Sequence, residues 1–178
     1  RPDWSGAARA ETPQQPWLVA ELAGWSLVDR LDVADLADEA AHGYTWWNQG
    51  RPDGFASEPR LMAYRADPPI SLPDGGRLLT GGEAFTLHTP QPTQWLRLVA
   101  RLHQTSDLTL RVRVNGSEAG RWRLPAVPGQ WLETAFLVPP DLLRGDQTAI
   151  ELLVLDPRRD ARGSPGPGGA GRGRAGGR

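Results

Sequence analysis

The sequence predicts an all-β fold, an antiparallel β-sandwich with one short helix near residues 33–42, and three observations lead to this prediction. Residues 108–114 alternate strictly between apolar and polar side chains, and an asparagine–glycine pair follows them at once. Similar short segments recur at intervals of about 8–12 residues, as in sandwiches and barrels. Alternation with a period of two places one face in a core and the other in water, which is typical of antiparallel sheets.

The hairpin around Asn115–Gly116 is the strongest local signal. Both residues tolerate positive φ, which a two-residue hairpin turn requires. The chain resumes at 117–124 with Trp122 and Leu124 on the apolar side. We therefore predict a core formed by the inward residues of this hairpin and of the strands around it (Leu96, Leu98, Leu102, Leu110, Val112, Val114, Trp122, Leu124, Ile150, Leu152 and Val154).

The other elements follow in chain order. Residues 32–43 are rich in alanine, carry acidic residues and end at Gly43, which predicts a helix of two or three turns that depends on packing. Residues 139–146 suggest a one-turn helix. Short strands are predicted on either side of these helical segments (17–22, 24–29, 44–47, 60–64, 83–88, 95–103, 131–138 and 148–155).

The chain of 178 residues is long enough for one domain with a sizeable core. We expect a polar, proline-rich lead-in or linker at 1–16, the β-sandwich domain at 17–157, and a disordered tail at 158–178. The tail is composed mainly of glycine, arginine and proline, which cannot bury a core. The first residue is not methionine, so we expect the chain to be a segment of a longer precursor.

Composition excludes several functions. The sequence has no cysteine, so disulfides, cysteine-ligated zinc and thiol catalysis are ruled out. Residues 1–157 hold 14 arginines against 20 acidic residues, and this acidic balance argues against a nucleic-acid partner. No stretch approaches 18 apolar residues, so no membrane span is expected within this segment.

From residue 111 the chain reads Arg-Val-Arg-Val-Asn-Gly, then Gly-x-Trp-x-Leu, Pro-Gly-x-Trp and Val-Pro-Pro before a last apolar strand. This order of motifs resembles galactose-binding-like jelly-roll domains, which occur as carbohydrate-binding modules and as accessory domains of glycosidases and other bacterial surface enzymes. Residues 32–47, ending Glu-Ala-Ala-His-Gly-Tyr-x-Trp, are similar to extracytoplasmic β-sandwich domains of multispanning bacterial membrane proteins, some of them glycosyltransferases. The resemblance implies a jelly-roll fold and an extracytoplasmic accessory domain whose ligand is a glycan. No set of positions matches a calcium site of such domains.

Eight tryptophans offer candidate sugar platforms, because the apolar face of a pyranose stacks on an indole. Alternation assigns Trp122 to the core, and Trp25, Trp95 and Trp131 are expected in the core or at its rim. Neighbours on a strand point to opposite faces, so one of the adjacent Trp46 and Trp47 must face away from the core. A polar loop at 48–54 follows them. The predicted ligand-binding residues are therefore Trp46, Trp47, Asn48, Tyr44, His42, Arg51 and Asp53.

The sequence favours a non-catalytic protein without cofactor or metal. Glu39 and His42 have the i, i+3 spacing of a metal-ligating pair, but a second such pair is missing. A histidine at this place more often interacts with the helix C-terminus and a carboxylate. His88 and His103 have no serine or aspartate at a catalytic spacing, and Gly-x-Ser-x-Gly is absent. No spacing selects a carboxylate pair for glycoside hydrolysis.

Six arginines lie opposite the apolar residues of their strands and would form one basic stripe if these strands were neighbours (Arg97, Arg101, Arg111, Arg113, Arg121 and Arg123). Such a stripe could bind an anion or an acidic glycan. The alternative, which the sequence favours, is a solvated face offset by cross-strand partners such as Glu133 and Glu151.

Two functions are favoured by the sequence, and an enzyme, which would need a converging carboxylate pair or a histidine-centred triad in a deep pocket, comes third. The first is carbohydrate binding by an accessory domain. The second is a structural or protein-interaction domain without sugar affinity that contacts its parent protein or sister subunits. Exposed tryptophans at a concave face or a loop rim would favour the first.

Overall fold

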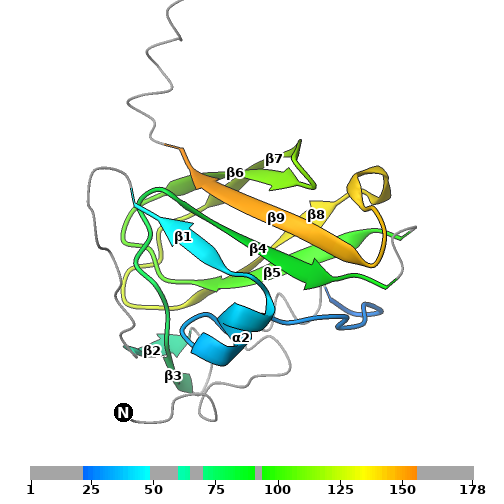
Figure 1. Cartoon of the computed structure of the whole chain (residues 1–178). Helices are drawn as coiled ribbons and strands as arrows, with labels where there is room; N and C mark the ends of the chain where they lie inside the picture. The colour runs from blue at the N-terminus through cyan, green and yellow to red at the C-terminus, as the bar shows by residue number, and fades with distance from the viewer. Residues whose placement is uncertain (1–21, 49–59, 65–69, 91–93, 156–178) are drawn as a thin grey trace, which may run out of the picture.

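The computed structural model describes residues 22–48, 60–64, 70–90 and 94–155. Secondary structure in these ranges consists mainly of antiparallel strands (Figure 1). In chain order the elements are α2 (Leu36–Ala41), β1 (Thr45–Trp47), β2 (Arg60–Tyr64), β3 (Ile70–Asp74), β4 (Gly82–His88), β5 (Leu96–Leu102), β6 (Leu108–Val114), β7 (Ser117–Leu124), β8 (Leu132–Val138), the 3-10 turn η1 (Pro140–Leu142) and β9 (Gln147–Val154).

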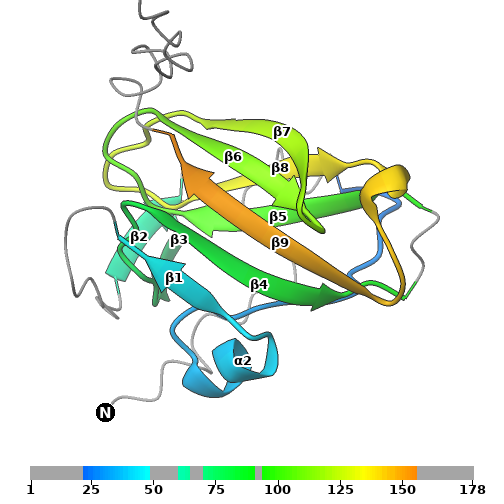
Figure 2. The same cartoon turned by 45° about the horizontal axis from the view of Figure 1, so that its top comes forward.

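The fold is a β-sandwich, as predicted. Strands β1, β4, β9, β6 and β7 form one antiparallel sheet in that order, and β5 pairs with β8 in a second sheet. Figures 1 and 2 show β5 and β8 passing behind the five-stranded sheet, with α2 beside its β1–β4 edge. Strands β2 and β3 form a separate two-stranded sheet.

The core lies between the two larger sheets. Its buried residues come mainly from alternate positions of β4, β6, β7 and β9 on one side and β5 and β8 on the other. Most of the predicted core residues are buried, and Trp122 is only 4% exposed. Leu96, Leu102 and Val154 are half-buried and pack against this core. Strict alternation therefore predicted correctly which residues of these strands face the core.

The β6–β7 hairpin has the predicted turn. Asn115 and Gly116 adopt φ angles of 50° and 80°, and the flanking residues Val114 and Ser117 face each other across the ladder. The Asn115 side chain also accepts a hydrogen bond from the Ala149 N–H at 3.0 Å and donates one to the Leu142 carbonyl at 2.9 Å. The turn is thus bonded to β9 and to η1.

Helix α2 begins later than predicted. Ala34 has a positive φ of 81°, which is incompatible with a right-handed helix, and the helix begins only after Asp35. The Asp35 carboxylate caps it by accepting hydrogen bonds from the N–H groups of Ala37 and Asp38.

Two strand predictions need correction. The strand predicted at 24–29 is wrong, because no ladder forms there and Leu27 is 69% exposed, so its apolar residues have no buried face. Strand β3 was not predicted, because prolines at 68, 69 and 73 read as turn residues. Proline is tolerated in a two-stranded ribbon, where both strands are edges.

A cluster of buried charges joins β3 to the β5–β8 sheet. The Arg101 guanidinium donates hydrogen bonds to Asp74 at 2.7 Å and to Glu133 at 2.8 Å and 3.0 Å. All three side chains are largely buried, Glu133 almost completely. The end of β3 is thereby bound to the outer face of this sheet.

The predicted lead-in at 1–16, the tail at 158–178 and the strand at 17–22, apart from Leu22, lie outside the described residues. In the ranges that the structure describes, no helix is long and apolar enough to cross a membrane.

Candidate functional site

The outer face of the five-stranded sheet carries two rows of side chains that run across all five strands. The ladder registers align one residue of each strand in each row. These residues face outward, because their chain neighbours Leu152, Val112 and Trp122 are buried in the core. The first row is Trp47, Gly82, Leu153, Arg111 and Arg121. The second is Thr45, Ala84, Glu151, Arg113 and Glu118.

Trp47 is an aromatic platform at the β1 end of the first row. Its indole packs against Gly81 and Gly82, where a Cβ would lie 2.8 Å and 2.7 Å from ring atoms. Any larger residue at either position would therefore displace the ring. Trp47 remains 36% exposed, so one part of the indole is fixed against backbone while another part faces solvent.

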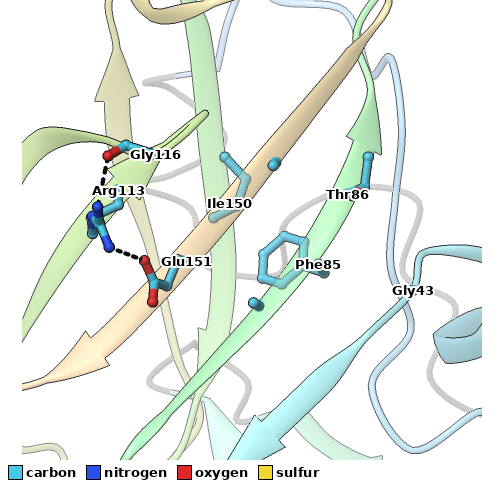
Figure 3. A pocket seen from close by; sticks show the side chains of 9 residues that line it. Gly43, Phe85, Thr86, Arg113, Gly116, Ile150 and Glu151 are labelled. Carbon is cyan, nitrogen blue, oxygen red and sulfur yellow. Dashed lines mark hydrogen bonds and ion pairs between the residues drawn. The ribbon is translucent and has the colours of Figure 1, made fainter.

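An open hollow of about 300 Å³ lies on this face, over β4 and β9 (Figure 3). Small residues leave the space, with Ala84, Thr86 and Ala149 on neighbouring strands of the sheet. Arg113 and Glu151 form one side of the hollow. Arg113 donates to Glu151 at 2.9 Å and to the Gly116 carbonyl at 2.8 Å, as Figure 3 shows.

The six arginines do not form one stripe, because the strands that carry them are not all neighbours. Arg97 and Arg101 lie on β5, in the other sheet, whereas the other four lie on β6 and β7. Alternation places a residue on a face of its strand but does not say which sheet the strand joins. The predicted acidic partners are confirmed, because Arg101 pairs with Glu133 and Arg113 with Glu151.

Arg111 and Arg121 are directly opposite each other on β6 and β7. The nearest acid to Arg111 is Glu118, whose carboxylate lies 4.0 Å from Nε, and this nitrogen is buried without a hydrogen bond among the described residues. Arg121 and Arg123 are exposed and form no ion pair within the part of the chain that the structure describes. This end of the face is therefore positively charged.

Trp46 and Tyr44 belong to a polar network on the opposite side of β1. Trp46 is aligned with Glu83 and Leu152, so it faces inward. The Arg77 guanidinium lies 5.5 Å from the centre of the Trp46 ring and 5.7 Å from that of Tyr44, within cation–π range. Arg77 also makes a bidentate ion pair with Glu39, and both side chains are buried.

The Tyr44 hydroxyl donates a 2.7 Å hydrogen bond to Glu83. Burial raises the pKa of Glu83 against the effect of this hydrogen bond, and the nearby Glu39 carboxylate raises it further. Burial also raises the pKa of Tyr44, as does the charge of Glu83. Glu83 could have been recognised as inward from its alternation with Phe85 and Leu87.

Asn48 holds the end of β1 beside the segment that precedes β4. Its carbonyl oxygen accepts hydrogen bonds from the Thr80 N–H at 2.6 Å and the Thr80 hydroxyl at 3.1 Å, and its amide donates to the Leu78 carbonyl at 3.3 Å. Asn48 therefore fixes the chain on which the Trp47 platform rests.

His42 lies at a separate place, at the end of α2. Its Nδ1 is 2.8 Å from the Asp38 carbonyl and its Nε2 is 3.4 Å from Asp29, whose carboxylate also accepts a 2.6 Å hydrogen bond from the His88 N–H. Burial acts to lower the pKa of His42, but the contacts with Asp38 and Asp29 outweigh it, so the pKa is raised.

Burial acts in the opposite direction on Asp29 and would raise its pKa. The hydrogen bonds that its carboxylate accepts outweigh burial and lower the pKa. His42 and Asp29 line a second open hollow of about 480 Å³ between α2 and β4, so the ion pair faces solvent there.

The structure thus divides the predicted site residues among three places. Trp47 and Asn48 lie at the β1 edge of the outer face, Trp46 and Tyr44 in the buried network, and His42 at the end of α2. Arg51 and Asp53 lie outside the described residues.

The remaining described tryptophans differ in burial. Trp131 is 6% exposed and contacts His103, whereas Trp25, stacked on Arg97 at 4.7 Å, and Trp95 are 38% and 53% exposed. Within the described ranges, no three histidine or acidic side chains form a group that could hold a metal ion.

Comparison with known proteins gives a likeness of fold. No protein-family model matches the sequence, and no curated protein is significantly similar to it. A family 35 carbohydrate-binding module from Clostridium thermocellum matches with 16% identity and a TM-score of 0.35, over 43% of this chain and 61% of that one. A second family 35 module, from an environmental isolate, matches with 17% identity and a TM-score of 0.42, over 65% of this chain and 78% of that one.

Both matched proteins are carbohydrate-binding modules, the class of domain that the sequence motifs resemble. Since both TM-scores are below 0.5, the description of the fold as a β-sandwich rests on the strand order and the packing of the core given above.

Proposed function

We propose that this is a non-catalytic accessory domain that binds a glycan on the outer face of its five-stranded sheet. The observation that supports it best is the geometry of Trp47, an indole held against Gly81 and Gly82 with its remaining surface exposed. An aromatic ring fixed before binding loses little conformational freedom when a sugar stacks on it. We also propose that the domain acts outside the cytoplasm, as do the domains that its sequence resembles.

The surroundings of Trp47 suit a sugar. Gly82, Ala84 and Thr86 project little beyond the sheet, so a sugar chain can approach the backbone over the hollow. Thr45, Arg113 and Glu151, in the neighbouring row, can hydrogen-bond hydroxyl groups. An apolar platform with a few polar groups beside it is the usual composition of a ligand site.

Within this site the predicted residues take different roles. Trp47 contacts the sugar, Asn48 holds the chain beside it, and Arg51 and Asp53 are kept as proposed ligand-binding residues. Trp46 and Tyr44 support the site from behind the sheet through their contacts with Arg77 and Glu83, whereas His42 contacts Asp29 at a separate place.

The test is a titration of wild type and the Trp47→Ala variant with neutral and acidic oligosaccharides. We expect wild type to bind with millimolar or better affinity and Trp47→Ala to lose roughly 1–2 kcal/mol, about 5- to 30-fold in Kd. The matched control is Trp95→Ala, which removes an exposed indole just before β5 of the other sheet. Equal binding by Trp47→Ala and wild type would contradict the proposed site.

One observation favours the second function, a protein-interaction domain. Trp95, Val99 and Leu137 occupy outward positions at the β5–β8 sheet and are 53%, 38% and 44% exposed. Three exposed apolar side chains on one face are suited to contact with a parent protein or sister subunit. If wild type binds no oligosaccharide, and replacing Leu137 with arginine abolishes association with the parent protein, the interaction function applies instead.

A further inference from the structure

Arg111 and Arg121 lie at the opposite end of the first row from Trp47. From them we infer that the glycan is acidic and that they bind its carboxylate or sulfate group. This inference rests on the proposed function and specifies its ligand class. It concerns residues that lie three and four strands from Trp47 in the same row across the sheet.

The first reason is the placement of like charges. Arg111 and Arg121 are direct cross-strand partners, and like charges directly opposite each other destabilise a sheet. Arg113, in the next row, shows how this protein neutralises an arginine, because it has Glu151 at 2.9 Å. Among the described residues Arg111 has only Glu118 within 4.0 Å, and that carboxylate is itself 59% exposed. An anion between the two guanidinium groups would remove the repulsion.

The second reason is that the positive charge is local. Four arginines and two glutamates lie on the outer side of β6, β7 and β9 (Arg111, Arg113, Arg121 and Arg123 with Glu118 and Glu151), although residues 1–157 as a whole are acidic. Guanidinium groups bind carboxylate and sulfate oxygens through paired, charge-assisted hydrogen bonds. A small anionic group, rather than an extended polyanion, fits this restricted patch.

The third reason is the spacing. Arg111 is three strands from Trp47, which corresponds to roughly 14 Å at about 4.8 Å per strand. The hollow lies beside this path, because Ala84 and Glu151 belong to the neighbouring row. One sugar ring cannot contact both ends, so the ligand is an oligosaccharide that stacks on Trp47 and places its anionic group some rings away.

The experiment measures binding of tetragalacturonate and of the same tetrasaccharide fully methyl-esterified, in which an uncharged methyl ester replaces each carboxylate. A sulfated galactan tetrasaccharide distinguishes sulfate from carboxylate. We expect wild type to bind one of the acidic forms about tenfold or more tightly than the ester. Arg111→Gln and Arg121→Gln should lose this preference and keep the affinity for the ester. Arg144→Gln removes the same charge from an exposed turn and should bind as wild type does.

The Tm of the same variants serves as the folding control. Removing one of two opposed arginines should not lower it. Binding of ester and acids with equal affinity, unchanged in the arginine variants but weakened by Trp47→Ala, would overturn the inference and leave the proposed function intact. Binding of no tetrasaccharide would overturn both. A single-stranded oligonucleotide bound as tightly as the acidic sugars, independently of Trp47, would show an unselective anion surface and also overturn the inference.

Discussion

At the scale of residues, two adjacent tryptophans show how a strand assigns opposite roles to neighbours. Trp46 faces inward and contacts Arg77, whereas Trp47 faces outward and lies on two glycines. Adjacency in the sequence was enough to predict that they separate. That Trp47 would be the outward one follows only from the register of β1 with β4, which pairs Trp46 with Glu83.

Gly82→Ala should displace the Trp47 ring, because the added Cβ would lie 2.7 Å from the ring and 2.6 Å from the Leu152 carbonyl oxygen. We expect a loss of about 1–3 kcal/mol in the free energy of unfolding, as overpacking generally costs, together with weaker glycan binding. Urea denaturation and sugar titration measure the two effects. Gly76→Ala is the control, since its Cβ would meet Trp131 at an ordinary 4.0 Å. A Gly82→Ala variant as stable as this control would contradict the packing described for Trp47.

His42 should make stability depend on pH. Because its pKa is raised in the folded protein, its stabilising effect is complete below the ordinary value of 6.5 and is lost as the pH rises through the folded value. Asp29, whose pKa is lowered, stays ionised over this range. We expect His42→Gln to lower the Tm by about 2–4 °C at about pH 5.5 and much less at about pH 8.5. The same loss at both pH values would show that the imidazolium charge is not involved.

At the scale of elements, α2 is too short to be stable alone and depends on its contacts. Asp35 caps its first turn, and Glu39, its buried residue, pairs with Arg77 from the segment between β3 and β4. The helix was predictable from its composition. Its attachment was not, because Arg77 is 38 residues away from Glu39 and stands in a segment that reads as a loop.

Glu39→Gln should destabilise the protein strongly, by about 3–5 kcal/mol, because it leaves the buried Arg77 charge without its carboxylate. The double variant Glu39→Gln, Arg77→Met removes both charges and should lose less than the sum of the single variants. Urea denaturation of wild type, Glu39→Gln, Arg77→Met and the double variant gives the coupling energy. Additive losses would mean that the two side chains do not interact as described.

At the scale of the whole molecule, alternation predicted most strands and most of the core, because inward residues are mainly apolar where one face of a strand is buried, but it missed Leu87, Val138 and Leu143. What it could not predict is how strands far apart in the sequence are combined. In the five-stranded sheet, β1 and β4 lie next to β9 and β6, which are distant in the sequence. The hollow and the two rows of the outer face depend on this strand order, as does the placement of Arg97 and Arg111 in different sheets. Arg51 and Asp53, outside the described residues, remain predictions.

Trp122→Ala tests the core that joins the two sheets. Trp122 is 4% exposed, contacts Phe136 of β8 with ring centres 5.7 Å apart, and directs its indole N–H toward Thr134. We expect a loss of about 3–5 kcal/mol in the free energy of unfolding, measured by urea denaturation. The exposed Trp95→Ala serves as the comparison and should cost far less.

The Arg101 cluster has a consequence for how the domain could work inside a larger protein. Arg101 binds Asp74 and so holds the end of β3 against one part of the outer surface of the β5–β8 sheet. The apolar part around Trp95 and Leu137 stays exposed. This open part lies on the opposite side of the sandwich from Trp47, with the core between them. A partner attached there would leave Trp47 free to hold a sugar chain, so anchoring and capture need not compete for the same surface.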